Sequence, residues 1–101
     1  MCNRYKISQA ASQDIENIWR YTTEKWSIEQ ADRYFNLIMD EIEHLSKYPK
    51  SGKDYSHVRK GYFRSQIKSH YIFYKINEKE DAIEIIRILH QRMNIDTRLN
   101  G

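Results

Sequence analysis

The sequence predicts an α+β fold of order β-α-α-β-β-β, in which an antiparallel sheet packs one face against a helical hairpin. Two adjacent stretches, 11–22 and 31–48, repeat apolar residues at helical spacing. Three later stretches are rich in β-branched and aromatic residues and are separated by short polar loops: 58–67, 71–76 and 82–89. A chain of 101 residues has room for one domain, which we expect to span 1–101.

The first part of the chain predicts a strand followed by a helix. Residues 4–7 alternate polar and apolar side chains, which is typical of a short edge strand. Ser8 or Ser12 can cap the next helix. Trp19 and Trp26 flank the apolar face of that helix, and this position predicts core residues, with binding anchors as the alternative. That apolar face consists of Ala11, Ile15, Ile18 and Thr22.

The second helix has a clear start and a clear end. Ser27 and Gln30 form a capping box at its start. Pro49 ends it, because the residue before a proline disfavours the helical conformation. Between them a helical stripe predicts the buried face: Ala31, Tyr34, Phe35, Ile38, Ile42, Leu45 and Tyr48. The two helices, joined by a tight turn, should form a hairpin.

The last three strands should form an antiparallel meander. Gly61, inside the strand 58–67, suggests a bulge or a close backbone approach. The final strand carries Arg87 within an apolar run and ends in the basic exit His90–Met93, so Arg87 belongs to a site or to a fixed internal ion pair. The face away from the hairpin should be free and basic. Residues 94–101 lack a core pattern and predict a mobile or short helical tail.

Composition and charge limit the class of protein. The chain is 40% hydrophobic and 31% charged, as in soluble globular proteins, and its single cysteine, Cys2, permits no internal disulfide. Neither a secretory signal nor a membrane-spanning stretch is visible, so we expect a cytoplasmic protein with no membrane partner. Residues 13–43 contain eight acidic and three basic residues, whereas residues 47–75 contain eight basic and one acidic. Such an uneven distribution of charge predicts binding partners of particular charge. The alternative is that the two segments form solvated faces that differ in sign and have no role in binding.

Several kinds of catalytic site have no support. The four histidines lie far apart in sequence and form no helix-spaced ligand pair, so neither a metal nor any other cofactor is expected. Serine in a glycine-flanked elbow and phosphate-binding glycine loops are both absent. Only Glu84 lies within a strand, which excludes hydrolysis by paired carboxylates.

A metal-free ribonuclease remains open on residue types alone. Histidines can transfer protons near neutral pH, and arginines can stabilise the charge of a phosphorane-like transition state. The residues of the right types on the predicted sheet are Arg64, His70, Arg87 and His90. The alternative is that Arg87 pairs with an internal acid and that His90 is a strand-end residue with a satisfied hydrogen bond.

Short motifs along nearly the whole chain resemble the RelE/ParE superfamily of toxins from bacterial toxin–antitoxin pairs. The closing motif, Arg87-Ile-Leu-His90-x-Arg92-Met93, points to the ParE branch. The other motifs are Tyr5-Lys-Ile-Ser8, Asp14-Ile-x-x-Ile18-x-x-Tyr-Thr22, Lys25-Trp26, Gln30-Ala-x-x-Tyr34, Tyr48-Pro49, Arg59-x-Gly-Tyr62 and His70-Tyr-Ile-Phe-Tyr74. The resemblance implies the same β-α-α-β-β-β order.

The resemblance implies a toxin that acts by binding. ParE-like toxins block DNA gyrase on cleaved DNA, arrest replication and are held inactive by a ParD-type antitoxin. The expected target is gyrase in its complex with DNA. The residues expected to bind this target are Arg59, Arg64, Arg87, His90, Arg92 and Met93. Aromatic residues expected to anchor the antitoxin are Trp19, Trp26 and Tyr34.

Other functions and assemblies stay open. The RelE branch cleaves messenger RNA in the ribosome, which is the enzyme alternative here. A third reading is a toxin-like scaffold kept for antitoxin binding or operon repression. If the apolar surface of the hairpin is incompletely covered, a homodimer or a toxin–antitoxin heterotetramer is expected.

Overall fold

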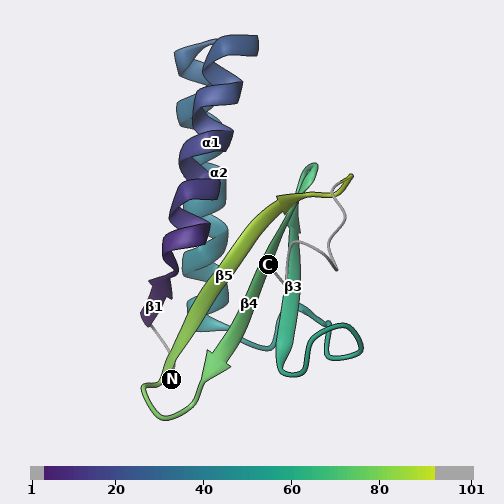
Figure 1. Cartoon of the computed structure of the whole chain (residues 1–101). Helices are drawn as coiled ribbons and strands as arrows, with labels where there is room; N and C mark the ends of the chain where they lie inside the picture. The colour runs from purple at the N-terminus through teal and green to yellow at the C-terminus, as the bar shows by residue number, and fades with distance from the viewer. Residues whose placement is uncertain (1–3, 93–101) are drawn as a thin grey trace.

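The computed structural model describes residues 4–92 and has the predicted α+β architecture, with two helices packed against one face of a five-stranded sheet (Figure 1). Met93 and the predicted tail 94–101 lie outside the described residues. The elements are β1 (Arg4–Ile7), α1 (Gln9–Lys25), α2 (Ile28–Lys47), β2 (Lys53–Asp54), β3 (Tyr62–Ile67), β4 (His70–Asn77) and β5 (Ala82–His90). The strand order in the sheet is β1-β5-β4-β3-β2.

The sheet is mixed rather than wholly antiparallel. The predicted meander is present in β3, β4 and β5, and β1 is an edge strand as expected. However, β1 pairs in parallel with β5, from Arg4 opposite Ala82 to Ile7 opposite Ile85. Short turns force consecutive strands to run antiparallel, but the direction of β1 depends on the helices that separate it from β5. The sequence pattern of residues 4–7 could not reveal that direction.

Serine hydroxyls cap both helices. Ser8, rather than Ser12, caps α1, because its Oγ accepts from the Ala11 N–H at 3.0 Å. Ser27 caps α2 as predicted, accepting from the Gln30 N–H at 3.1 Å. The hairpin therefore begins and turns at side chains that satisfy otherwise unpaired backbone donors. Helix α2 ends at Lys47, two residues before Pro49.

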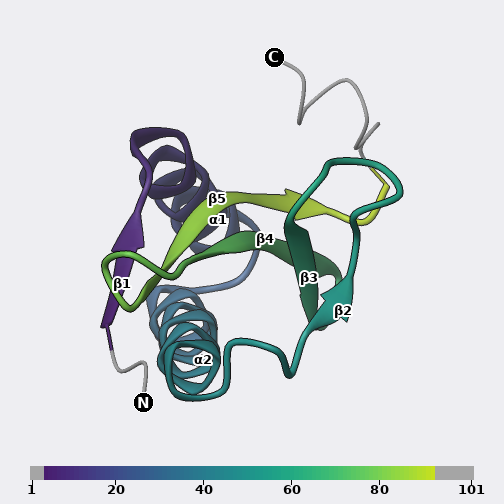
Figure 2. The same ribbon diagram turned by 90° about the horizontal axis from the view of Figure 1, so that it is seen from below.

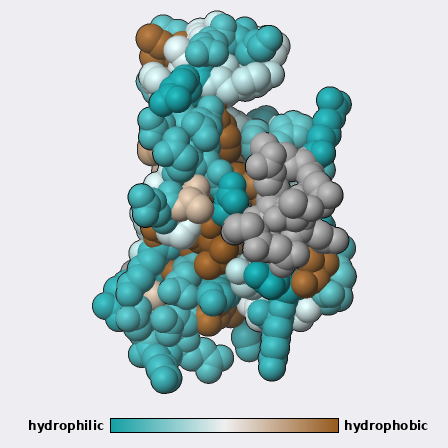
Figure 3. Space-filling view, in the orientation of Figure 1, coloured by the Kyte–Doolittle hydropathy of each residue, from teal (hydrophilic) through white to brown (hydrophobic). Residues whose placement is uncertain are grey.

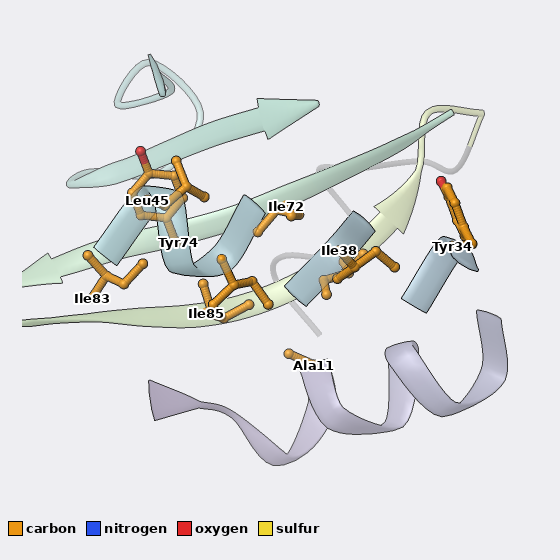
Figure 4. Packing of buried hydrophobic residues seen from close by; sticks show 10 residues of the cluster. Ala11, Tyr34, Ile38, Leu45, Ile72, Tyr74, Ile83 and Ile85 are labelled. Carbon is orange, nitrogen blue, oxygen red and sulfur yellow. The ribbon is translucent and has the colours of Figure 1, made fainter. Parts of the chain in front are cut away.

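The main core lies between the hairpin and the sheet (Figure 4). Figure 4 shows Ile38 and Leu45 of α2 facing Ile72, Ile83 and Ile85 of the sheet. Most of the predicted helical stripe is buried there. Phe35 and Tyr48 are corrections, because they are 39% and 58% exposed. Phe35 follows the buried Tyr34 by one residue, about 100° around the helix, and Tyr48 lies past its last turn.

The other face of the sheet is partly covered, contrary to our expectation. Phe73 and Leu89 are fully buried there in a second cluster. The segment between β2 and β3 passes over this face (Figure 2), and the partners packed on the cluster are Tyr55, Val58, Tyr62 and Tyr71. The predicted strand start at Val58 is therefore wrong. Residues 55–61 form a loop before β3, closed by the Tyr55 N–H donating to the Tyr62 carbonyl at 2.8 Å.

The glycine prediction also needs correction. Gly61 lies in the turn before β3 at a φ of 81°, and a side chain there would meet nothing within 4 Å. The close approach occurs instead at Gly52, where a Cβ would lie 2.3 Å from the Tyr74 hydroxyl. That hydroxyl accepts from the Gly52 N–H and donates to the Pro49 carbonyl, which fixes the connection between α2 and β2. The irregular register lies between β4 and β5, at Phe73 and Tyr74.

Candidate functional site

The first candidate surface is a cavity of about 670 Å³ between the hairpin and the end of the sheet, which we call the hairpin groove. The helical turn between α1 and α2 stands beyond the sheet (Figure 1), and hydrophobic residues are visible along the junction of hairpin and sheet (Figure 3). Ile18, Tyr21 and Trp26 line the groove from the hairpin, and Ile88 lines it from β5. A concave, mainly apolar site of this size is suited to binding a ligand or a peptide.

Polar side chains also line the groove, and among them Tyr34, His70 and His90 are linked by hydrogen bonds or ring contacts. The Tyr34 hydroxyl lies 2.7 Å from His70 Nδ1 and 3.1 Å from the Ile67 carbonyl. A carbonyl can only accept, so we assign the tyrosine proton to Ile67 and a donating Nδ1–H to His70. His90 Nδ1 accepts from the Arg92 N–H at 3.1 Å, so a neutral His90 carries its proton on Nε2.

His70 is held neutral at physiological pH. Burial, with a smaller contribution from the neighbouring His90, lowers its pKa to about 4, although Asp14 acts in the opposite direction. The two imidazoles meet edge to face with centroids 5.2 Å apart. A histidine with so low a pKa is a poor general acid near pH 7, because efficient proton transfer needs a pKa near the working pH.

Arg87 is fixed in an internal ion pair. Its Nε and one of its terminal nitrogens donate to the two carboxylate oxygens of Asp14 in α1 at 2.7 and 2.9 Å, and both side chains are largely buried. Asp14 also accepts from the Ile88 N–H at 3.0 Å. It therefore occupies the edge of β5 where β1 has already ended. The hypothesis of an internal partner for Arg87 is confirmed, as is the satisfied ring nitrogen of His90.

The second candidate surface is the face of the sheet away from the hairpin, which we call the far face. Directly paired residues of neighbouring strands point to the same side. Arg64 lies opposite both Lys53 and Phe73, and Tyr62 lies opposite Lys75. Since Phe73 belongs to the second cluster, Lys53 and Arg64 share the far face with it.

Aromatic rings hold Arg64 on the far face. Its guanidinium carbon lies 4.3 Å from the ring centre of Tyr71 and 5.2 Å from that of Tyr55. We call these three residues the tyrosine clamp. The contacts are cation–π interactions, which fix a charged side chain without neutralising it.

The predicted target-binding residues are divided between the two surfaces. Arg64 lies on the far face, and the exposed Arg59 lies in the loop that covers it. His90 lines the hairpin groove, and Arg87 is bound to Asp14. Arg92 is exposed just after β5. The four residues named for a ribonuclease therefore do not form one cluster, since Arg64 lies on the face opposite His70 and His90.

The three predicted antitoxin anchors differ in their surroundings. Trp26 is 76% exposed and lines the groove, so its predicted core position is wrong. Tyr34 is only 7% exposed and belongs to the core, although it also contributes to the groove. Trp19 is half-buried, and its Nε1–H donates to Asp32 at 3.0 Å, which links α1 to α2.

Sequence reasoning missed two sets of residues. Lys53, Tyr55 and Tyr71 join Arg64 on the far face, and the alternation of side chains along β3 and β4 would have placed Tyr71 there once the register was known. Asp14 carries no comparable signal, because its partner Arg87 is distant in sequence and belongs to another element.

Two general properties of the described residues bear on function. Neither helix within residues 4–92 combines the length and apolarity that crossing a bilayer requires. The same part of the chain contains no group of three or more histidine, cysteine or acidic side chains arranged to hold a metal ion.

The fold is shared with chains from solved structures of toxin–antitoxin systems. The chain is similar to a structure described as the chromosomal ParDE system of P. aeruginosa, with a TM-score of 0.75 and 16% identity over 86% of this chain and 94% of that one. It is also similar to a chain of the toxin–antitoxin complex RelBE2 from Mycobacterium tuberculosis, with a TM-score of 0.68 and 17% identity over 89% and 99%. At these identities the likeness concerns the fold.

Sequence similarity then defines the family. Residues 5–95 match the family described as the ParE toxin of type II toxin–antitoxin systems, parDE. Toxin ParE1 of Mycobacterium tuberculosis is 34% identical, covering 98% of this chain and 100% of that protein. Toxin ParE1 of Caulobacter vibrioides is 36% identical, covering 94% and 96%. The chain belongs to the ParE toxin family, as its closing motif predicted.

Proposed function

We propose that this ParE-type toxin inhibits DNA gyrase by binding the gyrase–DNA complex, and that a ParD-like antitoxin holds it inactive. The match to the ParE family over residues 5–95 carries the proposal. The geometry supports action by binding, because the residues named for RNA cleavage are separated. Arg87 is paired with Asp14, Arg64 lies on the other face, and His70 has a pKa of about 4.

The hairpin groove supports the antitoxin part of the proposal. Two exposed large aromatic side chains, Tyr21 and Trp26, line this groove together with the buried Ile88, and such a surface suits the apolar face of an amphipathic segment. Trp26 is the best-placed anchor, because it is exposed and belongs to the groove, whereas Trp19 is engaged with Asp32. An antitoxin bound here would contact the toxin on the side opposite the tyrosine clamp.

The test is gyrase supercoiling in the presence of purified toxin. We expect supercoiling to stop and linear DNA to accumulate after denaturation, and addition of the cognate antitoxin to reverse this. Supercoiling that continues at saturating toxin would refute the proposal.

A ribonuclease assay on ribosome-bound messenger RNA distinguishes the alternative function, RNA cleavage, from gyrase inhibition. The neighbouring histidines, His70 and His90, are the observation that favours it. RNA breaks that disappear in His90→Ala would establish the enzyme, whereas we expect no breaks. Arg87→Ala is a weaker probe, because it also leaves Asp14 without its partner.

A further inference from the structure

The tyrosine clamp holds Arg64 through aromatic rings and not through an ion pair with any acidic residue in the described part of the chain. No carboxylate within residues 4–92 pairs with Arg64, in contrast to Arg87, whose charge is matched by Asp14. Asp54, which follows the cross-strand neighbour of Arg64 on β2, accepts instead from the Ser56 N–H at 2.8 Å. The positive charge of Arg64 therefore remains available to an external anion.

The clamp also fixes the orientation of the Arg64 guanidinium. An arginine stacked on aromatic rings loses little side-chain entropy on binding, because its planar group is already oriented. The edge of the guanidinium carries several N–H donors that match the oxygens of a phosphate. Arg64 is half-buried against its tyrosines, so the ring contacts restrict it without removing it from the surface.

Further positive charges surround Arg64. Lys53 is its cross-strand neighbour, Lys75 lies on the same face, and both side chains are exposed. Lys60 is exposed in the loop above the face. One acidic residue, Glu84, also lies on this face, opposite Lys75. This arrangement suits a polyanion with repeated phosphates better than a single carboxylate, since several cations are spread over one surface.

We propose that the far face, centred on the tyrosine clamp, binds nucleic-acid phosphates directly, with Arg64 as the oriented contact. In the setting of the proposed function, the toxin would touch the DNA of the gyrase complex and not only the enzyme. That biological role rests on the proposed function, but the binding site itself does not. An acidic protein surface is the competing occupant.

The experiment measures binding of the purified toxin to a fluorescein-labelled DNA duplex without gyrase, by anisotropy. We expect affinity to fall steeply between about 50 and 200 mM salt. Arg64→Ala should weaken binding about tenfold and reduce the slope of log K against log salt by about one. Arg64→Lys keeps the charge but loses the planar guanidinium, so its affinity for the duplex should lie between those of the unmodified toxin and Arg64→Ala.

A matched control removes the same charge elsewhere. Arg33 is exposed on α2, so Arg33→Ala should leave affinity within about twofold of the unmodified toxin. The thermal midpoint of each variant shows whether it is folded. Equal losses in Arg64→Ala and Arg33→Ala, or no duplex binding by the unmodified toxin at low salt, would overturn the inference.

A parallel gyrase assay keeps the two proposals separate. Duplex binding that depends on Arg64, without gyrase inhibition, would support the site and refute the proposed function. Gyrase inhibition without any duplex binding would overturn the phosphate site and leave the proposed function standing.

Discussion

His70 shows how a half-buried polar ring can be accommodated at the edge of a core. Its Nδ1–H donates to the Tyr34 hydroxyl, which in turn donates to the Ile67 carbonyl. Because the neutral ring satisfies this chain of hydrogen bonds, protonation would place a charge where the surroundings favour none. The consequence is a dependence of stability on pH.

We predict that the toxin loses stability on acidification through His70. Its pKa is about 4 in the folded chain and 6.5 in an unfolded one, so the unfolded state binds more protons between these values. The stability is fully present above pH 6.5 and is lost as the pH falls towards 4. We expect about 1–2 kcal/mol, less than the full linkage value, because the ring is partly exposed.

Urea unfolding over this pH range measures the effect. His70→Asn, which retains a side-chain N–H donor for Tyr34, should remove most of the acid-induced loss. His57→Asn is the matched control, because His57 is exposed in the far-face loop. Identical pH dependence in the parent and in His70→Asn would show that other groups govern the acid limb.

The ion pair between Asp14 and Arg87 is the second residue-scale feature with a measurable effect. Asp14→Ala should lower the free energy of unfolding by about 2–3 kcal/mol, because it removes the carboxylate that accepts from the Arg87 guanidinium and from the Ile88 N–H. Glu16→Ala breaks the exposed pair with Arg20 and should cost less than about 0.5 kcal/mol. Similar losses in the two variants would contradict the structural role of Asp14.

At the scale of elements, the edge of β5 determines how the hairpin meets the sheet. Strand β1 covers only Ala82 to Ile85. Ser8 continues the edge, since its N–H donates to the Ile85 carbonyl and its hydroxyl donates to that of Ile86. Further along the same edge, the Asp14 carboxylate accepts a hydrogen bond from the Ile88 N–H. The start of α1 thus protects an edge that would otherwise be open to unwanted pairing.

The two helix caps should consequently differ in importance. Ser27→Ala removes one capping bond and should destabilise the protein by about 1 kcal/mol. Ser8→Ala removes a capping bond and also the bond to Ile86, so its loss should reach about 2 kcal/mol. Chemical denaturation of both variants tests the order, and a larger loss in Ser27→Ala would contradict it.

Local patterns explain which parts of the fold could be predicted. Helical spacing, the Ser27 cap and Pro49 are encoded within a few residues of their effects, and the short turns dictated the meander. The direction of β1, the loop over Phe73 and the Asp14–Arg87 pair depend on contacts between distant segments. Residue types alone could therefore suggest Arg64, His70, Arg87 and His90 as a set, but could not show that the fold separates them.

At the scale of the whole molecule, charge differs between the two sides. Exposed acidic residues occupy the hairpin, including Glu24, Glu29 and Asp40. Exposed lysines occupy the loop and strands of the far face, among them Lys53 and Lys75. Such a distribution orients the molecule towards a polyanionic target and leaves the hairpin groove for a different partner.

The most direct test of this arrangement is a titration of gyrase supercoiling with two charge-reversal variants. Lys53→Glu/Lys75→Glu reverses two charges on the far face, and Lys25→Glu/Arg33→Glu reverses the same number on the hairpin. We expect the far-face variant to need at least about tenfold more toxin for half-inhibition, with the hairpin variant close to the parent. Equal potency of the two variants would contradict a target-binding far face.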